Sequence, residues 1–128
     1  MANQKVLLID NDEEDQEIFC AALQDVDASF SCTMANNALN AIEKINTDPE
    51  FTPTIIFIDM NMPMINGLEC LQKLKTIERL RDTPVYIYST SASPSTIADA
   101  KRLGANDFVV KPVGFSQLTA LLSDLLVR

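Results

Sequence analysis

The 128-residue sequence predicts one α/β domain in which helices cover both faces of a parallel sheet. Apolar, strand-like runs alternate five times with amphipathic segments, as in chains that return to a parallel sheet through helices. Two of the runs, 6–9 and 55–58, are wholly apolar, which is typical of central strands buried on both faces. Hydrophobic residues make up 47% of the chain, and this content favours a packed core over disorder.

The five expected strands differ in pattern. They span residues 6–9, 30–34, 55–58, 85–88 and 108–110. In the second of these runs the apolar residues alternate with Ser31 and Thr33, which indicates an edge strand.

The segments between the strands carry helix signals. Asn66, with Glu69 three residues later, predicts a variant capping box at the start of the third helix. Ser93 followed by Pro94 predicts the start of the fourth helix. The remaining signals are the helical repeat of Ile18, Phe19, Ala22, Leu23 and Val26, a helix end near Gly104, and a leucine-rich last helix over 115–127 that Gly114 would cap.

Composition excludes several classes of function. The net charge of −8 makes nucleic acid an unfavourable direct partner. Histidine is absent, so histidine-based catalysis and histidine metal ligands are excluded. No apolar run is long enough to cross a bilayer, and residues 1–5 lead into the first strand without a secretory signal. We therefore expect a cytoplasmic protein with neither nucleic acid nor membrane as a partner.

The three cysteines, Cys20, Cys32 and Cys70, are widely spaced and form no CxxC pair. Disulfide and zinc roles are therefore not expected. Apolar neighbours favour small buried side chains, and a reducing cytoplasm is the simplest setting for them.

Polar residues gather at the ends of four expected strands. Ligands of such sheets bind beyond the carboxyl ends of the strands, so these positions are the candidate site. Carboxylates there suit Mg²⁺, a lysine can neutralise a phosphoryl oxygen, and an aspartate beside a metal can be phosphorylated. The residues are Asp10, Asn11 and Asp12; Asp59 and Asn61; Ser89, Thr90 and Ser91; and Lys111 and Pro112.

At these positions the chain resembles a response-regulator receiver domain of two-component signalling, over essentially its whole length. The run 59–63, Asp-Met-Asn-Met-Pro, is similar to the family's phosphoacceptor motif, and Gly67 follows eight residues after the acid. Lys111-Pro112 is similar to the conserved-lysine element and has the usual spacing from Asp59. Asp10, Ser89 and Phe108 match the first acid of the acidic pair, the switch hydroxyl and the rotating aromatic.

The resemblance implies a flavodoxin-like, doubly wound (βα)5 fold with strand order 2-1-3-4-5. It implies that residues 1–128 form a single receiver domain of the stand-alone chemotaxis or phosphorelay type, without an output domain. Asp59 would be the phosphoacceptor, Lys111 and Ser89 would contact the phosphoryl group, and Ser89 and Phe108 would be the switch. Mg²⁺ (or Mn²⁺) would bind Asp10, Asn11, Asp59 and the backbone carbonyl of Asn61, and a cis bond would precede Pro112.

Asn11 departs from the family pattern, which has a second acid at this position. An amide oxygen can bind Mg²⁺ but brings no charge, so weaker binding is expected. Asn11 could instead be a turn former, and Asp12 could compensate, although a capping role at the first helix is favoured for Asp12.

The expected function is acceptance of a phosphoryl group from a phosphohistidine on a sensor histidine kinase or a histidine phosphotransfer protein. The signal would then pass to an unknown protein target by conformational switching or by onward phosphotransfer. The chain would catalyse its own phosphorylation and dephosphorylation, yet act mainly as a switch. A pseudo-receiver that works without phosphorylation is the alternative that Asn11 suggests. A phosphatase of the haloacid-dehalogenase type is disfavoured because Asn61 stands where its second acid would be.

Overall fold

The computed structural model describes residues 4–127 and has one five-stranded sheet. All neighbouring strands are parallel, and the order β2-β1-β3-β4-β5 confirms the expected doubly wound topology. The strands are β1 (Lys5–Ile9), β2 (Ser31–Ala35), β3 (Ile55–Asp59), β4 (Val85–Ser89) and β5 (Asp107–Val110).

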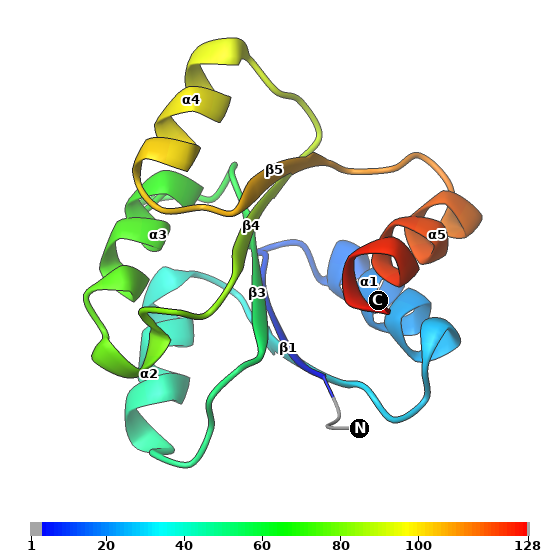
Figure 1. The fold of residues 1–128 in the computed structure, drawn as a ribbon, viewed down its shortest axis with the longest axis horizontal. Helices are drawn as coiled ribbons and strands as arrows, with labels where there is room; N and C mark the ends of the chain where they lie inside the picture. Colours follow the sequence, from blue (N-terminus) through cyan, green and yellow to red (C-terminus); the bar gives the residue numbers. More distant parts are fainter. Residues whose placement is uncertain (1–3, 128) are drawn as a thin grey trace.

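Helices cover both faces of this sheet (Figure 1). One face carries α1 (Glu13–Val26) and α5 (Phe115–Leu126), which lie side by side. The other face carries α2 (Ala38–Thr47), α3 (Gly67–Lys75) and α4 (Pro94–Arg102), and the short 3₁₀ helix η1 (Glu78–Leu80) precedes β4.

The central strands supply both hydrophobic cores. In β1, Val6 and Leu8 pack on the α1 and α5 side, whereas Leu7 and Ile9 pack on the opposite side. All four residues are fully buried, as their wholly apolar run predicts. Neighbouring residues of a strand point to opposite faces, so one short run contributes to both layers.

The helix signals in the sequence are confirmed at the ends that face the candidate site. Asn66 and Glu69 form the capping box of α3. Ser93 caps α4 with Pro94 at its first position, and Gly114 precedes α5 without a side-chain cap. Within residues 4–127, no helix is both long enough and apolar enough to span a bilayer.

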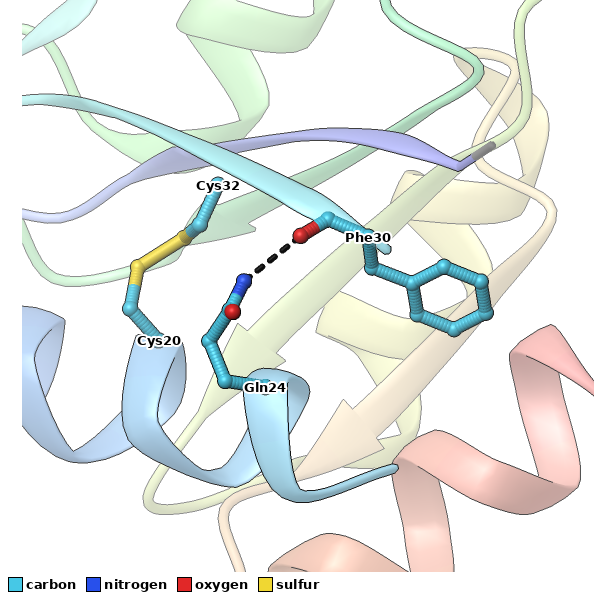
Figure 2. Close-up of a disulfide and its surroundings, with 4 residues drawn as sticks. All are labelled: Cys20, Gln24, Phe30 and Cys32. Atoms are coloured by element: carbon cyan, nitrogen blue, oxygen red, sulfur yellow. Dashed lines mark hydrogen bonds between the residues drawn. A yellow bond between two sulfur atoms is a disulfide. The ribbon is translucent and has the colours of Figure 1, made fainter. Parts of the chain in front are cut away.

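The expectation that the cysteines form no disulfide is wrong for one pair. Cys20 in α1 and Cys32 in β2 are bonded, with their Cα atoms 5.9 Å apart (Figure 2). Their separation of 12 residues is no sequence motif, but the turn between α1 and β2 brings the two side chains together. Cys70 is free and buried, and burial raises the pKa of its thiol to about 12. The cytoplasmic location therefore loses its cysteine-based support and stays a prediction.

Candidate functional site

The sheet brings four of the predicted site residues to one edge. Asp10 follows β1, Asp59 ends β3, Ser89 ends β4 and Lys111 follows β5. The strand register aligns Ile9 with Ile58, so the two acids follow at equivalent depths. Parallel strands end at the same edge, and this explains how residues so far apart in sequence meet.

Lys111 connects the two acids. Its Nζ lies 3.1 Å from Asp10 Oδ2 and 3.7 Å from Asp59 Oδ1. Nζ also lies 5.2 Å from the centre of the Tyr88 ring, within the range of a cation–π contact. The lysine side chain is only 11% exposed, so its charge acts in a partly desolvated site.

Asp10 and Asp59 are buried carboxylates held close to one another. The backbone N–H of Asp12 donates to Asp10 Oδ1 at 2.9 Å, and that of Asn61 donates to Asp59 Oδ1 at 3.2 Å. Burial, and then the Asp10 carboxylate, raise the pKa of Asp59 to about 6, against the opposing effects of Lys111 and the Asn61 N–H. When both carboxylates are ionised, the pair therefore carries two negative charges beside the single positive charge of Lys111.

This donor set fits a hard divalent cation. Mg²⁺ commonly binds one or two carboxylates and completes its shell with carbonyl oxygens, waters and phosphate oxygens. Asp10 and Asp59 provide the two carboxylates. Asn11 is exposed beside them and lines a surface cavity of about 220 Å³ with Asn36 and Pro63. Across residues 4–127 no group of three or more acids or cysteines is arranged so that it could hold a metal.

Ser89 is buried beside the acids, with 1% of its surface exposed. Its Oγ accepts a 3.4 Å bond from the backbone N–H of Ser91, and its carbonyl accepts a 2.7 Å bond from the Lys111 N–H. Phe108, aligned with Ile87 in the sheet, is half-buried against the core on the α3 and α4 side. The hydroxyl and the aromatic therefore lie on neighbouring strands, and Thr90 and Ser91 are exposed.

The loop after Asp59 packs against the start of α3. The Gly67 N–H donates to the Met60 carbonyl at 3.0 Å. A Cβ at Gly67 would lie 2.8 Å from the Asp59 carbonyl oxygen and from Met60 Cα, a separation that side chains do not adopt. Glycine is therefore required for this close approach. Met64 in the same loop has a left-handed φ of 69°.

The cis bond expected before Pro112 is not present. No cis peptide bond occurs in the described part of the chain, so Lys111 and Pro112 are joined in the trans form. Trans is the preferred form of an X–Pro bond, and the sequence carries no signal that decides between the two.

Asp12 caps α1, which confirms the role favoured for it. Its side chain accepts a 3.1 Å bond from the Asp15 N–H. Two neighbours of the site were missed by the sequence reasoning. Asp15 Oδ2 lies 2.9 Å from Lys111 Nζ, and the buried Gln16 amide donates to the Asp10 carbonyl. Their only signal is position, because the first turn of the helix after Asp10 must pass beside the site.

A sequence model of the family described as "Response regulator receiver domain" matches residues 6–123. The chain belongs to this family. Over 121 residues it is 31% identical to the two-component response regulator ORR11 of Oryza sativa subsp. indica, an alignment that covers 94% of this chain and 80% of ORR11.

Solved receiver structures have the same fold. The chemotaxis protein CheY4 of Vibrio cholerae is 27% identical, with a TM-score of 0.83 and coverage of 98% of this chain and 100% of CheY4. Response regulator Rcp1, solved in a Mn²⁺-bound form, has a TM-score of 0.85 at 20% identity, with coverage of 98% and 96%. The chain is thus a CheY-like receiver domain of the two-component response regulators, a class that interacts with histidine kinases or phosphotransfer proteins.

Proposed function

We propose that Asp59 accepts a phosphoryl group from a phosphohistidine of a histidine kinase or phosphotransfer protein. The observation that carries this proposal is the joint burial of Asp59 and Asp10 around the ammonium of Lys111. A carboxylate oxygen of Asp59 attacks phosphorus, a P–O bond forms, and the P–N bond to the donor imidazole breaks. The released imidazole takes a proton from solvent, and later attack by water returns Asp59 and free phosphate.

Mg²⁺ (or Mn²⁺), when bound, would neutralise charge on the transferring phosphoryl oxygens. Asp10, Asp59, the backbone carbonyl of Asn61 and Asn11 are the proposed ligands. The two carboxylates, with the raised pKa of Asp59, fit such an ion. The structural neighbour Rcp1, solved in a Mn²⁺-bound form, supports the same choice of ion. Lys111 would balance the same charge as a cation already held in place.

Ser89 and Phe108 are the proposed switch. Ser89 is buried at the site edge, and the Phe108 backbone lies beside β4 in the register Ile87–Phe108. A bond from the Ser89 hydroxyl to a phosphoryl oxygen would shift the β4–α4 loop and the space open to Phe108. Asn61 and Ser91, both exposed beside the site, would set the rate of hydrolysis.

The protein is further proposed to work as a stand-alone receiver that signals through contact with a protein target or through onward phosphotransfer. ORR11 and CheY4 support this proposal, because the chain covers 80% and 100% of their respective lengths.

The test is incubation with acetyl phosphate and Mg²⁺, followed by intact-protein mass spectrometry. We expect the wild type to gain the mass of one phosphoryl group. The gain should be absent when a chelator is added before the donor, and absent in Asp59→Asn. Asp25→Asn, which removes an exposed acid of α1, should react as the wild type does. No gain in the wild type, together with no Mg²⁺-dependent binding of beryllofluoride, would favour the pseudo-receiver reading.

A further inference from the structure

Lys111 makes its shortest ion pair with an acid outside the predicted site. Asp15 Oδ2 lies 2.9 Å from Nζ, whereas Asp10 Oδ2 lies at 3.1 Å and Asp59 Oδ1 at 3.7 Å. The ammonium therefore lies closer to Asp15 of α1 than to the proposed phosphoacceptor Asp59. The bond to Asp15 is charge-assisted, but the 41% exposure of the Asp15 side chain reduces its contribution to stability.

The position of Asp15 is fixed by the start of α1. Asp12 caps this helix by accepting the Asp15 N–H at 3.1 Å, which sets the backbone of the first turn. Asp15 and Lys111 then line a surface cavity of about 490 Å³ together with Tyr88 and Thr90. The ion pair thus lies at the open side of the site.

The three acids around Lys111 differ in exposure. The Asp10 and Asp59 side chains are 0% and 8% exposed, but that of Asp15 is 41% exposed. Water can replace the lysine as a partner of Asp15 at little cost, whereas the buried acids depend on it. The bond to Asp15 is the one that can be exchanged.

The charge state of Lys111 agrees with this geometry. Burial acts to lower the pKa of Lys111, but the bond to Asp15 and the carboxylates of Asp10 and Asp59 outweigh it and raise the pKa. Lys111 therefore stays cationic, and phosphorylation can change the partner of its ammonium but not its charge.

We propose that Asp15 is a positioning residue that draws Lys111 away from Asp59 in the unphosphorylated protein. Lys111 exchanges Asp15 for a phosphoryl oxygen when Asp59 is phosphorylated, and Asp15 thereby slows phosphoryl transfer. This inference rests on the proposed phosphoacceptor role of Asp59.

The test compares the rate of phosphorylation by acetyl phosphate at saturating Mg²⁺ in Asp15→Asn, Asp15→Glu and the wild type. Asp15→Asn should react about two to five times faster, the factor that corresponds to a partly exposed ion pair. Asp15→Glu keeps the charge and should return the rate toward that of the wild type. Glu14→Gln removes an exposed acid from the same turn and should leave the rate unchanged.

Two further measurements separate this role from the others open to Asp15. Competitive acetylation of lysines in the unphosphorylated protein, read by peptide mass spectrometry, should show Lys111 more reactive in Asp15→Asn than in Glu14→Gln. The Kd for Mg²⁺ should be equal in Asp15→Asn and Glu14→Gln. A weaker Mg²⁺ affinity with slower phosphorylation would overturn the proposal and make Asp15 a metal ligand instead.

The outcomes also distinguish this inference from the assignment of Asp59. A wild-type protein that is never phosphorylated would overturn both. A wild type that is phosphorylated at Asp59, with Asp15→Asn no faster than Glu14→Gln, would overturn only the role of Asp15.

Discussion

Gln16 of α1 donates a 3.0 Å hydrogen bond to Asn36 Oδ1, just beyond the end of β2, and the same amide donates to the Asp10 carbonyl. Cys20 lies one helical turn later and is bonded to Cys32 of β2. A further turn on, the Gln24 amide donates to the Phe30 carbonyl at 2.6 Å (Figure 2). Residues four apart share one helix face, so these contacts join α1 to β2 along its length. The join ends at Asp10, beside the candidate site.

Reduction of the Cys20–Cys32 bond should destabilise the domain. The bond closes a loop of 12 residues' separation, and cross-links of this size typically contribute about 3 kcal/mol by restricting the unfolded chain. We expect reductant to lower the free energy of unfolding by about 2–4 kcal/mol, as measured by urea denaturation. The phosphorylation rate, measured at urea concentrations below the unfolding transition, should be nearly the same in the oxidised and reduced protein.

The double variant Cys20→Ser/Cys32→Ser provides the control, since its stability should not respond to reductant. Cys70→Ala should respond as the wild type does, because Cys70 is outside the bond and its buried thiol has a pKa of about 12. Equal stability of the oxidised and reduced wild type would contradict this prediction.

Sequence pattern predicted the parallel α/β architecture and much of the site, and the family resemblance supplied the strand order that the structure has. Wholly apolar runs identify strands buried on both faces, and the residues at their carboxyl ends must then meet. Asp10, Asp59 and Lys111 were located in this way. In the structure both carboxylates lie within 3.7 Å of Lys111 Nζ. The metal, switch and phosphoacceptor roles of these and the other site residues stay predictions.

The contacts that the sequence did not predict depend on how elements pack. Cys20 and Cys32 meet only because α1 lies over the edge strand β2, and no cysteine spacing encodes that crossing. No sequence signal separates Asp15 from Glu14 in the first turn of α1, and only its side-chain direction distinguishes the two residues. Periodicity assigns a residue to a face, whereas a side-chain contact needs the position of the neighbouring element.

Gly67→Ala should disrupt the site loop. The new Cβ would meet backbone atoms of Asp59 and Met60 at 2.8 Å, and backbone cannot move aside as a flexible side chain can. We expect a loss of stability of about 1–3 kcal/mol and a large fall in the phosphorylation rate, measured by urea denaturation and by mass spectrometry. Gly114→Ala is the matched control, because its Cβ would meet only the end of the Gln117 side chain. Equal effects of the two variants would contradict the argument from close packing.

Asp59 should make the metal-free protein less stable as the pH rises. Its pKa of about 6 in the folded protein exceeds the ordinary value of 3.8, so the folded state binds more protons between these values. The stability linked to Asp59 is full below about pH 4 and is lost as the pH rises through about 6. Asp59→Asn should therefore be about 1–3 kcal/mol more stable than the wild type near pH 7 in the presence of a chelator.

Urea denaturation across this pH range, with and without Mg²⁺, tests whether the free energy of unfolding falls as the pH rises. Mg²⁺ should stabilise the wild type near pH 7 and leave Asp59→Asn almost unchanged, because an ion that binds only the folded state adds stability. If the stability of the metal-free wild type rises between about pH 4 and 6 in parallel with that of Asp59→Asn, ionisation of Asp59 does not destabilise the folded protein.

Asn11→Asp should strengthen Mg²⁺ binding. The side chain is exposed next to the buried Asp10, and the change adds one charge near the proposed ion. At intermediate dielectric a charge about 4 Å from the ion contributes a few kcal/mol, part of which is lost to solvent, so a decrease in Kd of about tenfold is expected from titration calorimetry. Asn46→Asp adds the same charge at the far end of α2 and should leave the Kd unchanged. If both variants bind Mg²⁺ as the wild type does, Asn11 is a turn residue without contact to the metal, and the weaker site expected from its amide does not exist.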